Sequence, residues 1–462
     1  MNSKIKDFSE YIKGKKVALI GAGVSNMAAV DFLLSMGALL SVRDKQNDEA
    51  KAKMLEEKGA KIVFGEDYLK DIDEDILFKS PGIRPDVPEI AAAKARGAVV
   101  TSEMEVFLTL CPAKIYAVTG SDGKTTTTTL VSEMLCKEYG KRGEGKVYLG
   151  GNIGTPLLPF VCDMTEKDAA VVELSSFQLF AMSVHIDSAI VTNITPNHLN
   201  WHVDMNEYIA AKAKIFENHT ERDRLVLNAE NEITRSFADK TNAQVTLFSS
   251  KNHIRDRRGV YLDGEEIVYC DGKTLLPVML RSDIKIPGMH NVENYMAACA
   301  AVWGEVSAET MVEVARTFGG VAHRIEFVAE KDGVKYYNSS IDTSPTRTAA
   351  AMNAFSEKLV VIVGGYDKKI PLEPLAPLLL EHAKFVSATG ATGEKIMQLL
   401  LDSGYPCDKI VYTKEFDGAF RAAVNAAKEG DTVILSPACA SFDAFKNFET
   451  RGEHFKDLVH GL

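Results

Sequence analysis

The sequence predicts an α/β protein in which mainly parallel sheets are built from three successive series of strands and helices. Short apolar runs typical of buried strands recur along the chain and alternate with helix-like stretches such as NDEAKAKMLEEKG. Strands that alternate with helices of this length indicate βαβ units. New series begin near residues 103 and 321, so we expect three domains, at 1–102, 103–320 and 321–462.

Each series contributes its own set of expected strands. The first contains KKVALIG (15–21), LLSVRD (39–44), KIVFG (61–65) and ILFKSPG (76–82). The second contains KIYAVTG (114–120), KVYLGG (146–151), AAVVELSS (169–176), SAIVTNIT (188–195) and RLVLNAE (224–230). The third contains KLVVIVGG (358–365), KFVSATG (384–390), KIVYT (409–413) and DTVILSP (431–437). Two stretches, GVYLDGEEIVYCDG and RIEFVAEKDGVKYYN, alternate around Gly turns and predict antiparallel hairpins.

Composition and charge narrow the possible function classes. The chain has 462 residues, of which 46% are apolar and 25% charged, so it is neither disordered nor of low complexity. No apolar run approaches ~18 residues, and charges interrupt the first residues, MNSKIKDFSEYIKGKK, which argues against a membrane helix and a signal peptide. A net charge of −11 without a lysine or arginine block disfavours a nucleic-acid or membrane surface. Seven scattered cysteines without a CxxC pair predict reduced thiols in the cytoplasm.

A phosphate-binding loop is predicted between a strand and a helical run, at Gly120-Ser121-Asp122-Gly123-Lys124-Thr125-Thr126. A Gly-rich turn in this context aims backbone N–H groups and a helix N-terminus at phosphate oxygens. Lys124 would reach the outer phosphates, and the Thr125 hydroxyl would bind Mg²⁺. The general P-loop has a glycine where this chain has Val118, so we expect a shorter GxxGKT loop. An ordinary βα turn is the weaker alternative.

A second Gly-rich turn follows the first expected strand. Gly21-Ala22-Gly23 precedes a helix, and Asp44 ends the next strand about twenty residues later, which is the spacing of a dinucleotide fingerprint. Asn26 replaces the third glycine of that fingerprint. A turn that binds another nucleotide is therefore at least as well supported as an NAD site.

Two further side chains are expected to face the phosphate loop. Glu173 ends one strand, and His198 follows the next. In parallel sheets ligands collect beyond the carboxyl ends of strands, so these two residues and Thr125 would form a Mg²⁺ site. Taken alone, each has an ordinary structural explanation, as a solvated charge and a hydrogen-bonded loop histidine. His198 and His202 have helical spacing, but without a glutamate in an HExxH pattern a zinc site is the poorer interpretation.

The helix EYIAAKAKIFEN carries Lys212 and Lys214 among alanines. From this segment alone, solvated lysines on an exposed face are the default interpretation.

Taken together, these segments resemble the Mur ligase family. The resemblance covers nearly the whole chain and rests on GSDGKTT (120–126), GGNIGTP (150–156), ELSSFQL (173–179), TNITPNH (192–198), YIAAK (208–212), HNVEN (290–294), HRIE (323–326) and SPACASFDAFKNFETRGEHF (436–455). The last block is typical of the members that add D-glutamate.

The resemblance implies an ATP-dependent amide ligase that adds D-glutamate to UDP-N-acetylmuramoyl-L-alanine through an acyl phosphate, in cytoplasmic peptidoglycan precursor synthesis. It implies a Rossmann-like N-terminal domain for the UDP end, a central P-loop ATPase domain and a Rossmann-like C-terminal domain for the amino acid. ATP would be a cosubstrate, and two Mg²⁺ ions would assist. The partners would be these small molecules, with neither nucleic acid nor membrane, and the protein would be a monomer.

The resemblance also assigns roles to individual residues. The catalytic set would be Lys124, Glu173, His198 and Lys212. One Mg²⁺ would be bound by Thr125 and Glu173, and a second by His198 and a carbamylated Lys212. ATP would contact Gly120, Ser121, Asp122, Gly123, Lys124, Thr125, Thr126, Asn291, Asn294 and Arg324. The UDP substrate would contact Val24, Ser25, Asp44, Lys45, Asn152 and Ser175. D-Glutamate would contact Thr343, Lys368, Ser441 and Phe448, because a cation and hydroxyl groups suit its carboxylates.

One segment departs from the family pattern. Where the family commonly reads Asn-Asp-Ser-Lys-Ala-Thr-Asn, this chain has Asn338-Ser339-Ser340-Ile341-Asp342-Thr343-Ser344. The usual acid and lysine are missing, and we expect Asp342 to take over part of the nucleotide or amino-acid contact. A lesser departure is Asn197, which stands where an acid often precedes the histidine and makes the second metal site less negative.

Several other function classes compete with the ligase. An NAD-dependent dehydrogenase would explain the first Gly-rich turn but leaves the phosphate loop unused. A P-loop kinase or GTPase would use that loop but needs no two further α/β domains. A ligase that adds another amino acid, or glutamate to folate, is the nearest rival, and only the C-terminal block argues against it. A non-catalytic nucleotide-binding module is disfavoured because Lys124, Thr125, Glu173 and His198 occur together.

Overall fold

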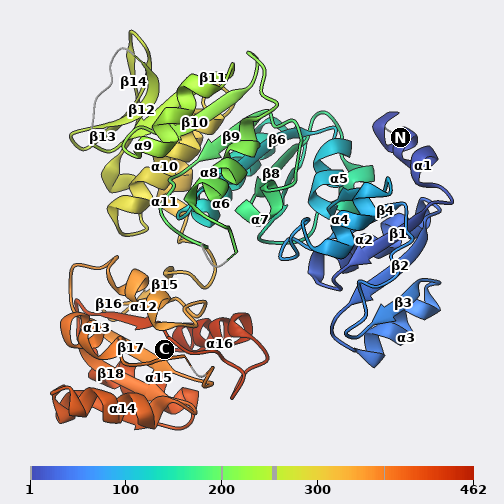
Figure 1. Cartoon of the computed structure of the whole chain (residues 1–462). Helices are drawn as coiled ribbons and strands as arrows, with labels where there is room; N and C mark the ends of the chain where they lie inside the picture. The colour runs from blue at the N-terminus through green and yellow to red at the C-terminus, as the bar shows by residue number, and fades with distance from the viewer. Residues whose placement is uncertain (1–2, 199–200, 252–256, 369) are drawn as a thin grey trace. The chain divides into compact units, whose positions relative to one another are not determined.

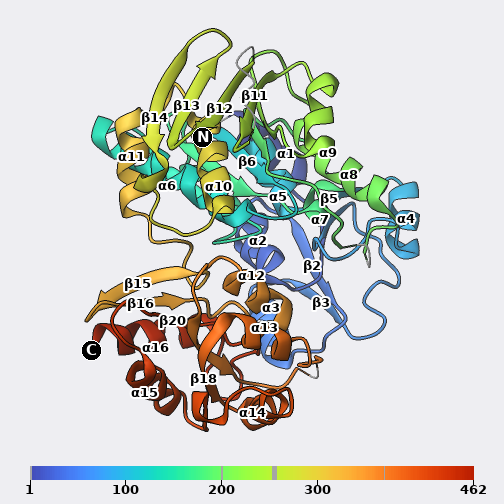
Figure 2. The ribbon, with the colours of Figure 1, turned by 90° about the vertical axis from the view of Figure 1, so that its left-hand side faces the viewer.

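The computed structural model describes residues 3–198, 201–251, 257–368 and 370–462 (Figures 1 and 2). The chain forms two compact units, Met1–Asp283 with Val292–Val314, and Ile284–Asn291 with Ala315–Leu462. No helix among the described residues is both long and apolar enough to cross a membrane.

The first unit begins with a parallel sheet in the order β3-β2-β1-β4-β5. Its strands are β1 (Lys16–Ile20), β2 (Leu39–Asp44), β3 (Lys61–Phe64), β4 (Ile76–Lys79) and β5 (Val99–Thr101). Its helices are α1 (Ser3–Ile12), α2 (Val24–Ser35), α3 (Glu49–Glu57) and α4 (Pro88–Ala95). Alternate residues of β1 face opposite cores, one shared with α2 and one with α4, which explains why the strand is a continuous apolar run. The strand order reverses at β1, where ligands bind in open α/β sheets.

A second sheet of the same unit has the order β14-β13-β12-β11-β10-β9-β6-β8-β7. Its strands are β6 (Lys114–Thr119), β7 (Val147–Gly151), β8 (Ala169–Glu173), β9 (Ser188–Val191), β10 (Arg224–Asn228), β11 (Gln244–Ser249), β12 (Arg258–Asp263), β13 (Glu266–Asp271) and β14 (Leu275–Leu280). The strands from β7 to β12 in this order are parallel, whereas β12, β13 and β14 pair antiparallel. The predicted hairpin at 259–272 is therefore confirmed.

Helices cover this second sheet, and most of them lie between its strands in the sequence (Figure 1). The α-helices between residues 103 and 317 are α5 (Glu103–Leu110), α6 (Lys124–Arg142), α7 (Ser176–Leu179), α8 (Met205–Ala213), α9 (Glu232–Arg235), α10 (Met289–Val302) and α11 (Ala308–Thr317). The 3₁₀ turns are η1 (Leu158–Asp163), η2 (Lys214–Phe216), η3 (Ser236–Lys240) and η4 (Arg281–Asp283). Helix α6 contacts β6, β7 and β8, which places its N-terminus at the carboxyl end of β6.

The second unit contains a sheet in the order β15-β16-β20-β17-β18-β19. Its strands are β15 (Glu326–Lys331), β16 (Val334–Asn338), β17 (Leu359–Gly364), β18 (Ala383–Thr389), β19 (Ile410–Thr413) and β20 (Thr432–Leu435). Its helical segments are α12 (Pro345–Met352), α13 (Leu375–His382), α14 (Gly393–Asp402), η5 (Cys407–Lys409), α15 (Phe416–Ala426) and α16 (Phe448–His460). Strand β15 pairs antiparallel with β16, which confirms the second hairpin.

Helices pack on both faces of this sheet (Figure 2). Val361 and Val363 of β17 share a core with α13 and α14, whereas Val360 and Ile362 share the opposite core with α15 and α16. The expected strand KLVVIVGG is therefore buried on both sides.

Candidate active site

The carboxyl ends of three parallel strands bring the expected phosphate-loop residues together. Strand β6 lies between β8 and β9, with Val118 opposite Glu173 and Thr119 opposite Val191. The phosphate loop follows β6, Glu173 ends β8, and the segment 192–198 follows β9. All three therefore meet at one edge of the sheet.

Two glycines give the phosphate loop its shape. Gly120 has φ +150° and Gly123 has φ +76°, backbone values that residues with a side chain rarely adopt. A Cβ at Gly120 would collide with the hydroxyl of Thr192, and one at Gly123 would collide with the amide of Asn294. The loop ends at the N-terminus of α6, whose first backbone N–H groups have no partner within the helix. This arrangement suits a phosphate.

Thr192 and Asn193, which follow β9, brace the loop, and sequence reasoning did not assign them this role. The Thr192 hydroxyl donates to the carbonyl oxygen of Asp122 (2.6 Å), and the side-chain oxygen of Asn193 accepts from the Asp122 N–H (2.9 Å). On the other side, the Ser121 hydroxyl lies 2.9 Å from that of Tyr208. The sequence feature that could have indicated this role is that both are polar residues directly after a buried strand.

Lys124 lies over the loop that precedes it. Its Nζ donates to the carbonyl oxygens of Gly120 (3.0 Å) and Ser121 (2.9 Å). The ammonium group is thus held at the mouth of the loop, where an outer phosphate of a bound nucleotide would lie. Asn294 also borders the loop, because a Cβ at Gly123 would meet its side-chain oxygen, which accepts from the Thr127 hydroxyl of α6 (3.3 Å).

Thr125, Glu173 and Asn152 form one connected group. The Thr125 hydroxyl donates to Oε2 of Glu173 (2.7 Å), and Nδ2 of Asn152 donates to Oε1 of the same carboxylate (2.8 Å). Glu173 is buried. A hydroxyl and a carboxylate oxygen in contact are the hard donors that Mg²⁺ prefers, so this pair fits the expected metal. Ser175, two residues later, caps α7 through the backbone N–H of Gln178.

Lys212 is almost completely buried, with an exposed fraction of 1%. Its Nζ donates to the carbonyl oxygen of Gly120 (2.7 Å) and lies 4.8 Å from the ring centre of Tyr208. Burial, reinforced by the charge of Lys124, lowers the pKa of Lys212 to about 7. Lys214 instead forms an ion pair with Glu217 at 2.8 Å. Lys212 lies in the last turn of α8 and Lys214 begins η2, and the default interpretation of two solvated lysines is wrong for Lys212.

His198 lies beside these groups in a left-handed conformation, with φ +56°. Its N–H donates to the side chain of Asn197 (2.8 Å), and its ring packs against Phe177 at 4.9 Å. Burial, followed by the charges of Lys124 and Lys212, lowers the pKa of His198. This shift favours the neutral imidazole, the form that binds metals.

His202 is not a partner for His198 in a zinc site. Its Nδ1 lies 3.1 Å from Oε2 of Glu207, and its Nε2 lies 2.9 Å from the hydroxyl of Ser176. Both ring nitrogens are therefore used.

One acidic group lies at the opposite edge of the same sheet. One atom each from His185, Asp187 and Asp223 lie within 4.8 Å of one another. Asp187 accepts from the N–H of Ile115, and Asp223 accepts from the N–H of Thr220. Asp187 and Asp223 directly precede β9 and β10, so these carboxylates lie at the amino ends of the strands, opposite the carboxyl ends that carry the phosphate loop.

A cavity of about 200 Å³ lies at the β1–α2 turn, where the uridine diphosphate is expected. Asp44 lines it and accepts from the N–H groups of Ala22 (2.5 Å) and Gln46 (2.7 Å). Val24 is exposed, Ser25 is the next residue of α2, and Lys45 pairs with Glu66.

The departure at Asn26 has a structural reason. The buried amide of Asn26 donates to the carbonyl oxygens of Gly21 (2.8 Å) and Phe78 (3.1 Å) and thereby ties β1 to β4. The third position of the fingerprint is thus a strand-to-strand link in this chain.

In the second unit, the structure brings Thr343 and Lys368 together. Nζ of Lys368 donates to the hydroxyl of Thr343 (3.1 Å). Ser441 is buried, and Phe448 begins α16. Asn291 and Arg324, which we expect to contact ATP, also belong to this unit.

Arg451 organises the segment around these residues and was not singled out from the sequence. Its guanidinium is buried and donates to the carbonyl oxygens of Ser340 (2.9 Å), Cys439 (3.1 Å) and Ala440 (3.1 Å). Burial lowers its pKa to about 10. The sequence feature that could have indicated this role is that Arg451 is a charged residue inside the block at 436–455.

Asp342 is buried, and its Oδ2 accepts from the hydroxyl of Ser436 (2.9 Å). Burial raises its pKa to about 6. The carboxylate faces the interior of its own unit.

Three family models match the chain: the Mur ligase MurD-like N-terminal domain at 15–102, the Mur ligase middle domain at 118–302, and the Mur ligase glutamate ligase domain at 323–439. Relatives named UDP-N-acetylmuramoylalanine--D-glutamate ligase from Acetivibrio thermocellus and Clostridium novyi are 48% and 46% identical, and both alignments cover 100% of this chain and of the relative. The chain belongs to the Mur ligase family. The Mur ligase fold class predicted from the sequence, with three α/β domains, is confirmed.

A solved structure agrees with this fold. The UDP-N-acetylmuramate-alanine ligase MurC from Thermotoga maritima matches with a TM-score of 0.58 and 20% identity, over 97% of this chain and 99% of that chain. At this identity the likeness supports the fold of a Mur ligase and nothing finer.

Proposed function

We propose that this protein is an ATP-dependent amide ligase that joins D-glutamate to UDP-N-acetylmuramoyl-L-alanine in cytoplasmic peptidoglycan precursor synthesis. The observation that carries the proposal is the site at the edge of β6, β8 and β9, where Lys124 and the Thr125–Glu173 pair adjoin one phosphate loop. The full-length relatives named for this reaction support the choice of substrates. The protein would act as a monomer on small molecules, with no nucleic-acid or membrane partner.

The first chemical step would activate a poor electrophile. The substrate carboxylate attacks the γ-phosphorus of ATP, the bond from that phosphorus to the β-bridging oxygen breaks, and an acyl phosphate and ADP form. Lys124 would stabilise the charge on the transferred phosphoryl group, while the loop N–H groups hold its neighbours. Gly120, Ser121, Asp122, Gly123, Thr126, Asn291, Asn294 and Arg324 would complete the ATP site.

The second step forms the amide. The amine nitrogen of D-glutamate attacks the acyl carbon, and the tetrahedral intermediate expels inorganic phosphate as the amine loses its proton. Lys368 and the hydroxyls of Thr343 and Ser441 would bind the carboxylates of D-glutamate, with Phe448 alongside. The UDP end would lie against Val24, Ser25, Asp44 and Lys45, and the reacting end near Asn152 and Ser175.

Two Mg²⁺ ions would fit the residues around the loop in different ways. Thr125 and Glu173 already present oxygen donors to one ion. His198 and Lys212 would hold the second only if the Lys212 amine carries a carbamate, because an ammonium repels a cation and a carbamate offers two anionic oxygens. When bound, the ions would neutralise charge on the phosphate oxygens.

A phosphate-release assay with an amino-acid panel tests the proposal. Purified protein is mixed with UDP-N-acetylmuramoyl-L-alanine and Mg²⁺-ATP, and D-glutamate, L-glutamate, L-lysine or meso-diaminopimelate is added. We expect phosphate release with D-glutamate alone. Equal turnover with L-glutamate, or activity only with another amino acid, would refute the substrate assignment and leave the ligase class standing.

A further inference from the structure

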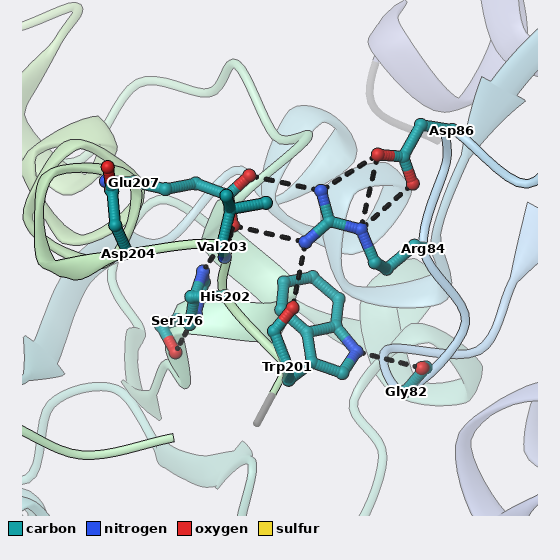
Figure 3. A network of polar contacts seen from close by, with 9 residues as sticks. All are labelled: Gly82, Arg84, Asp86, Ser176, Trp201, His202, Val203, Asp204 and Glu207. Atoms are coloured by element: carbon teal, nitrogen blue, oxygen red, sulfur yellow. Dashed lines mark hydrogen bonds and ion pairs between the residues drawn. The ribbon is translucent and has the colours of Figure 1, made fainter. Parts of the chain in front are cut away.

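Arg84 of the N-terminal domain contacts Trp201 and Glu207, which lie just before and within α8 (Figure 3). It lies in the loop after β4, and its Nη1 and Nη2 donate to the two carboxylate oxygens of Glu207 at 3.0 Å each. Nη1 also donates to the carbonyl oxygen of Trp201 (2.9 Å), while Nε and Nη2 donate to Asp86 (2.9 and 2.8 Å). A forked guanidinium with two acceptors on one carboxylate fixes orientation as well as distance.

Glu207 passes this contact on to the reacting end of the site. Its Oε2 also accepts from the N–H of Val203 (3.0 Å) and from Nδ1 of His202 (3.1 Å). In the neutral ring, Nδ1 donates to Glu207 and Nε2 accepts from the hydroxyl of Ser176 (2.9 Å). His202 is buried. The hydrogen-bonded path from Arg84 therefore ends three residues after Glu173.

A second contact runs alongside the first. Nε1 of Trp201 donates to the carbonyl oxygen of Gly82 (3.0 Å), and the Arg84 guanidinium lies over the Trp201 ring at 4.8 Å. The same loop also reaches the β1–α2 turn, because the Ser80 hydroxyl donates to the carbonyl oxygen of Gly21 (3.2 Å). Residues 80–84 thus contact the expected uridine diphosphate turn on one side and residues 201–207 on the other.

We propose that Arg84 is a positioning residue that sets the distance between the β1–α2 turn and the phosphate loop. This inference rests on the proposed function, in which one substrate spans both places. Glu207 and Lys212 share α8, and five residues correspond to about 7.5 Å along the helix. A substrate that is anchored at its uridine end brings its carboxylate to ATP only when the distance between the β1–α2 turn and the phosphate loop is kept. A misplacement of about 1 Å can cost roughly 10²-fold in rate.

Steady-state kinetics on the full-length protein test the proposal, with the Arg84→Ala, Arg84→Lys and Glu207→Gln variants and the double variant Arg84→Ala/Glu207→Gln. We expect Arg84→Ala to lower kcat/KM for the UDP substrate roughly tenfold or more, with the KM for ATP within about twofold of wild type. Arg84→Lys keeps the charge but loses the fork, so it should recover only part of the loss. The double variant should be no worse than the poorer single variant, because both remove one interaction.

Asp86→Asn is the matched control. Asp86 is exposed, lies in the same loop as Arg84 and pairs with the same guanidinium. We expect near wild-type kinetics from it, and thermal unfolding of every variant checks the fold. An equal rise in the KM for ATP and the KM for the UDP substrate, additive effects of Arg84→Ala and Glu207→Gln, or a defect in Asp86→Asn as large as that in Arg84→Ala would overturn the proposal. A wild-type protein that needs no D-glutamate would refute the proposed function instead.

Discussion

Carbamylation of Lys212 should follow the pKa that burial imposes on its amine. Only the neutral amine reacts with CO₂, and an ordinary lysine with a pKa of ~10.4 is neutral in roughly one molecule in a thousand near pH 7.4. Burial lowers the pKa of Lys212 to about 7. At the same pH roughly 0.7 of the amines are then neutral, a gain of several hundredfold. The site therefore favours the modification before any metal binds.

The pH dependence of labelling measures this effect. Protein is exposed to ¹³C-labelled CO₂ at constant dissolved CO₂, and the initial rate at which the carbamate carbon appears is followed by ¹³C NMR, because this rate is proportional to the neutral amine. With a pKa of about 7, half of the Lys212 amine is neutral near pH 7 and nearly all of it is neutral above pH ~8. Below pH ~6 the neutral fraction falls about tenfold per pH unit. Activity should fall when CO₂ is stripped from the buffer.

Lys214, two residues later at the start of η2, supplies the matched control. It is paired with Glu217, so Lys214→Met should keep both the label and the activity, whereas Lys212→Met should lose both. A labelling midpoint near the pKa of an ordinary lysine, or a carbamate signal that persists in Lys212→Met, would refute the reasoning.

Four further predictions concern the loop and the departure at Asp342. Lys124→Ala should reduce phosphate release ~10²–10³-fold with little change in thermal unfolding, because the ammonium contributes charge at the loop mouth rather than packing; retention of most activity would contradict this. Gly123→Ala should weaken ATP binding, measured by titration with a fluorescent ATP analogue, because its Cβ would collide with Asn294 at a φ of +76°; wild-type affinity would show that the loop adapts. Asp342→Ala should raise the apparent KM for ATP or D-glutamate at least several-fold, because the buried carboxylate directly precedes Thr343 and fixes its segment through the Ser436 hydroxyl; unchanged constants would make Asp342 a bystander. Since the folded pKa of Asp342 is raised to about 6, its ionisation destabilises the fold as pH rises from about 4 to 6, so Asp342→Asn should gain thermal stability relative to wild type across that window.

The expected strands were confirmed wherever burial on both faces made the sequence a continuous apolar run. Strands β6, β8 and β9 are of this kind, and with them the edge that carries the site could be predicted. Strand β14 was not predicted, because it is an edge strand that contains Pro277 and is buried only in part. Strand β5 is only three residues long, and β11 was also missed.

The individual environments of site residues depended on contacts that the sequence does not show. Lys212 and Lys214 look alike in AAKAK, but Lys212 is buried because its Nζ reaches Gly120, 92 residues earlier. Arg84 carried no local signal, since its partner Glu207 lies 123 residues away. The spacing of residues in the sequence could predict which helix or loop carries Lys212 or Arg84. It could not predict their partners, because the order of the strands in the sheet decides which distant segments lie side by side.

The central position of β6 also affects how the protein is synthesised. Its two neighbours, β8 and β9, follow it in the chain, so the first strand of this sheet emerges with both edges unpaired. At about 5–20 residues per second, residues 120–198 take roughly 4–16 s to appear. During that interval an apolar strand ahead of a glycine-rich loop is open to pairing with other chains. A nascent chain would thus benefit from a chaperone at this point, and ribosomal pauses after β6 would favour aggregation.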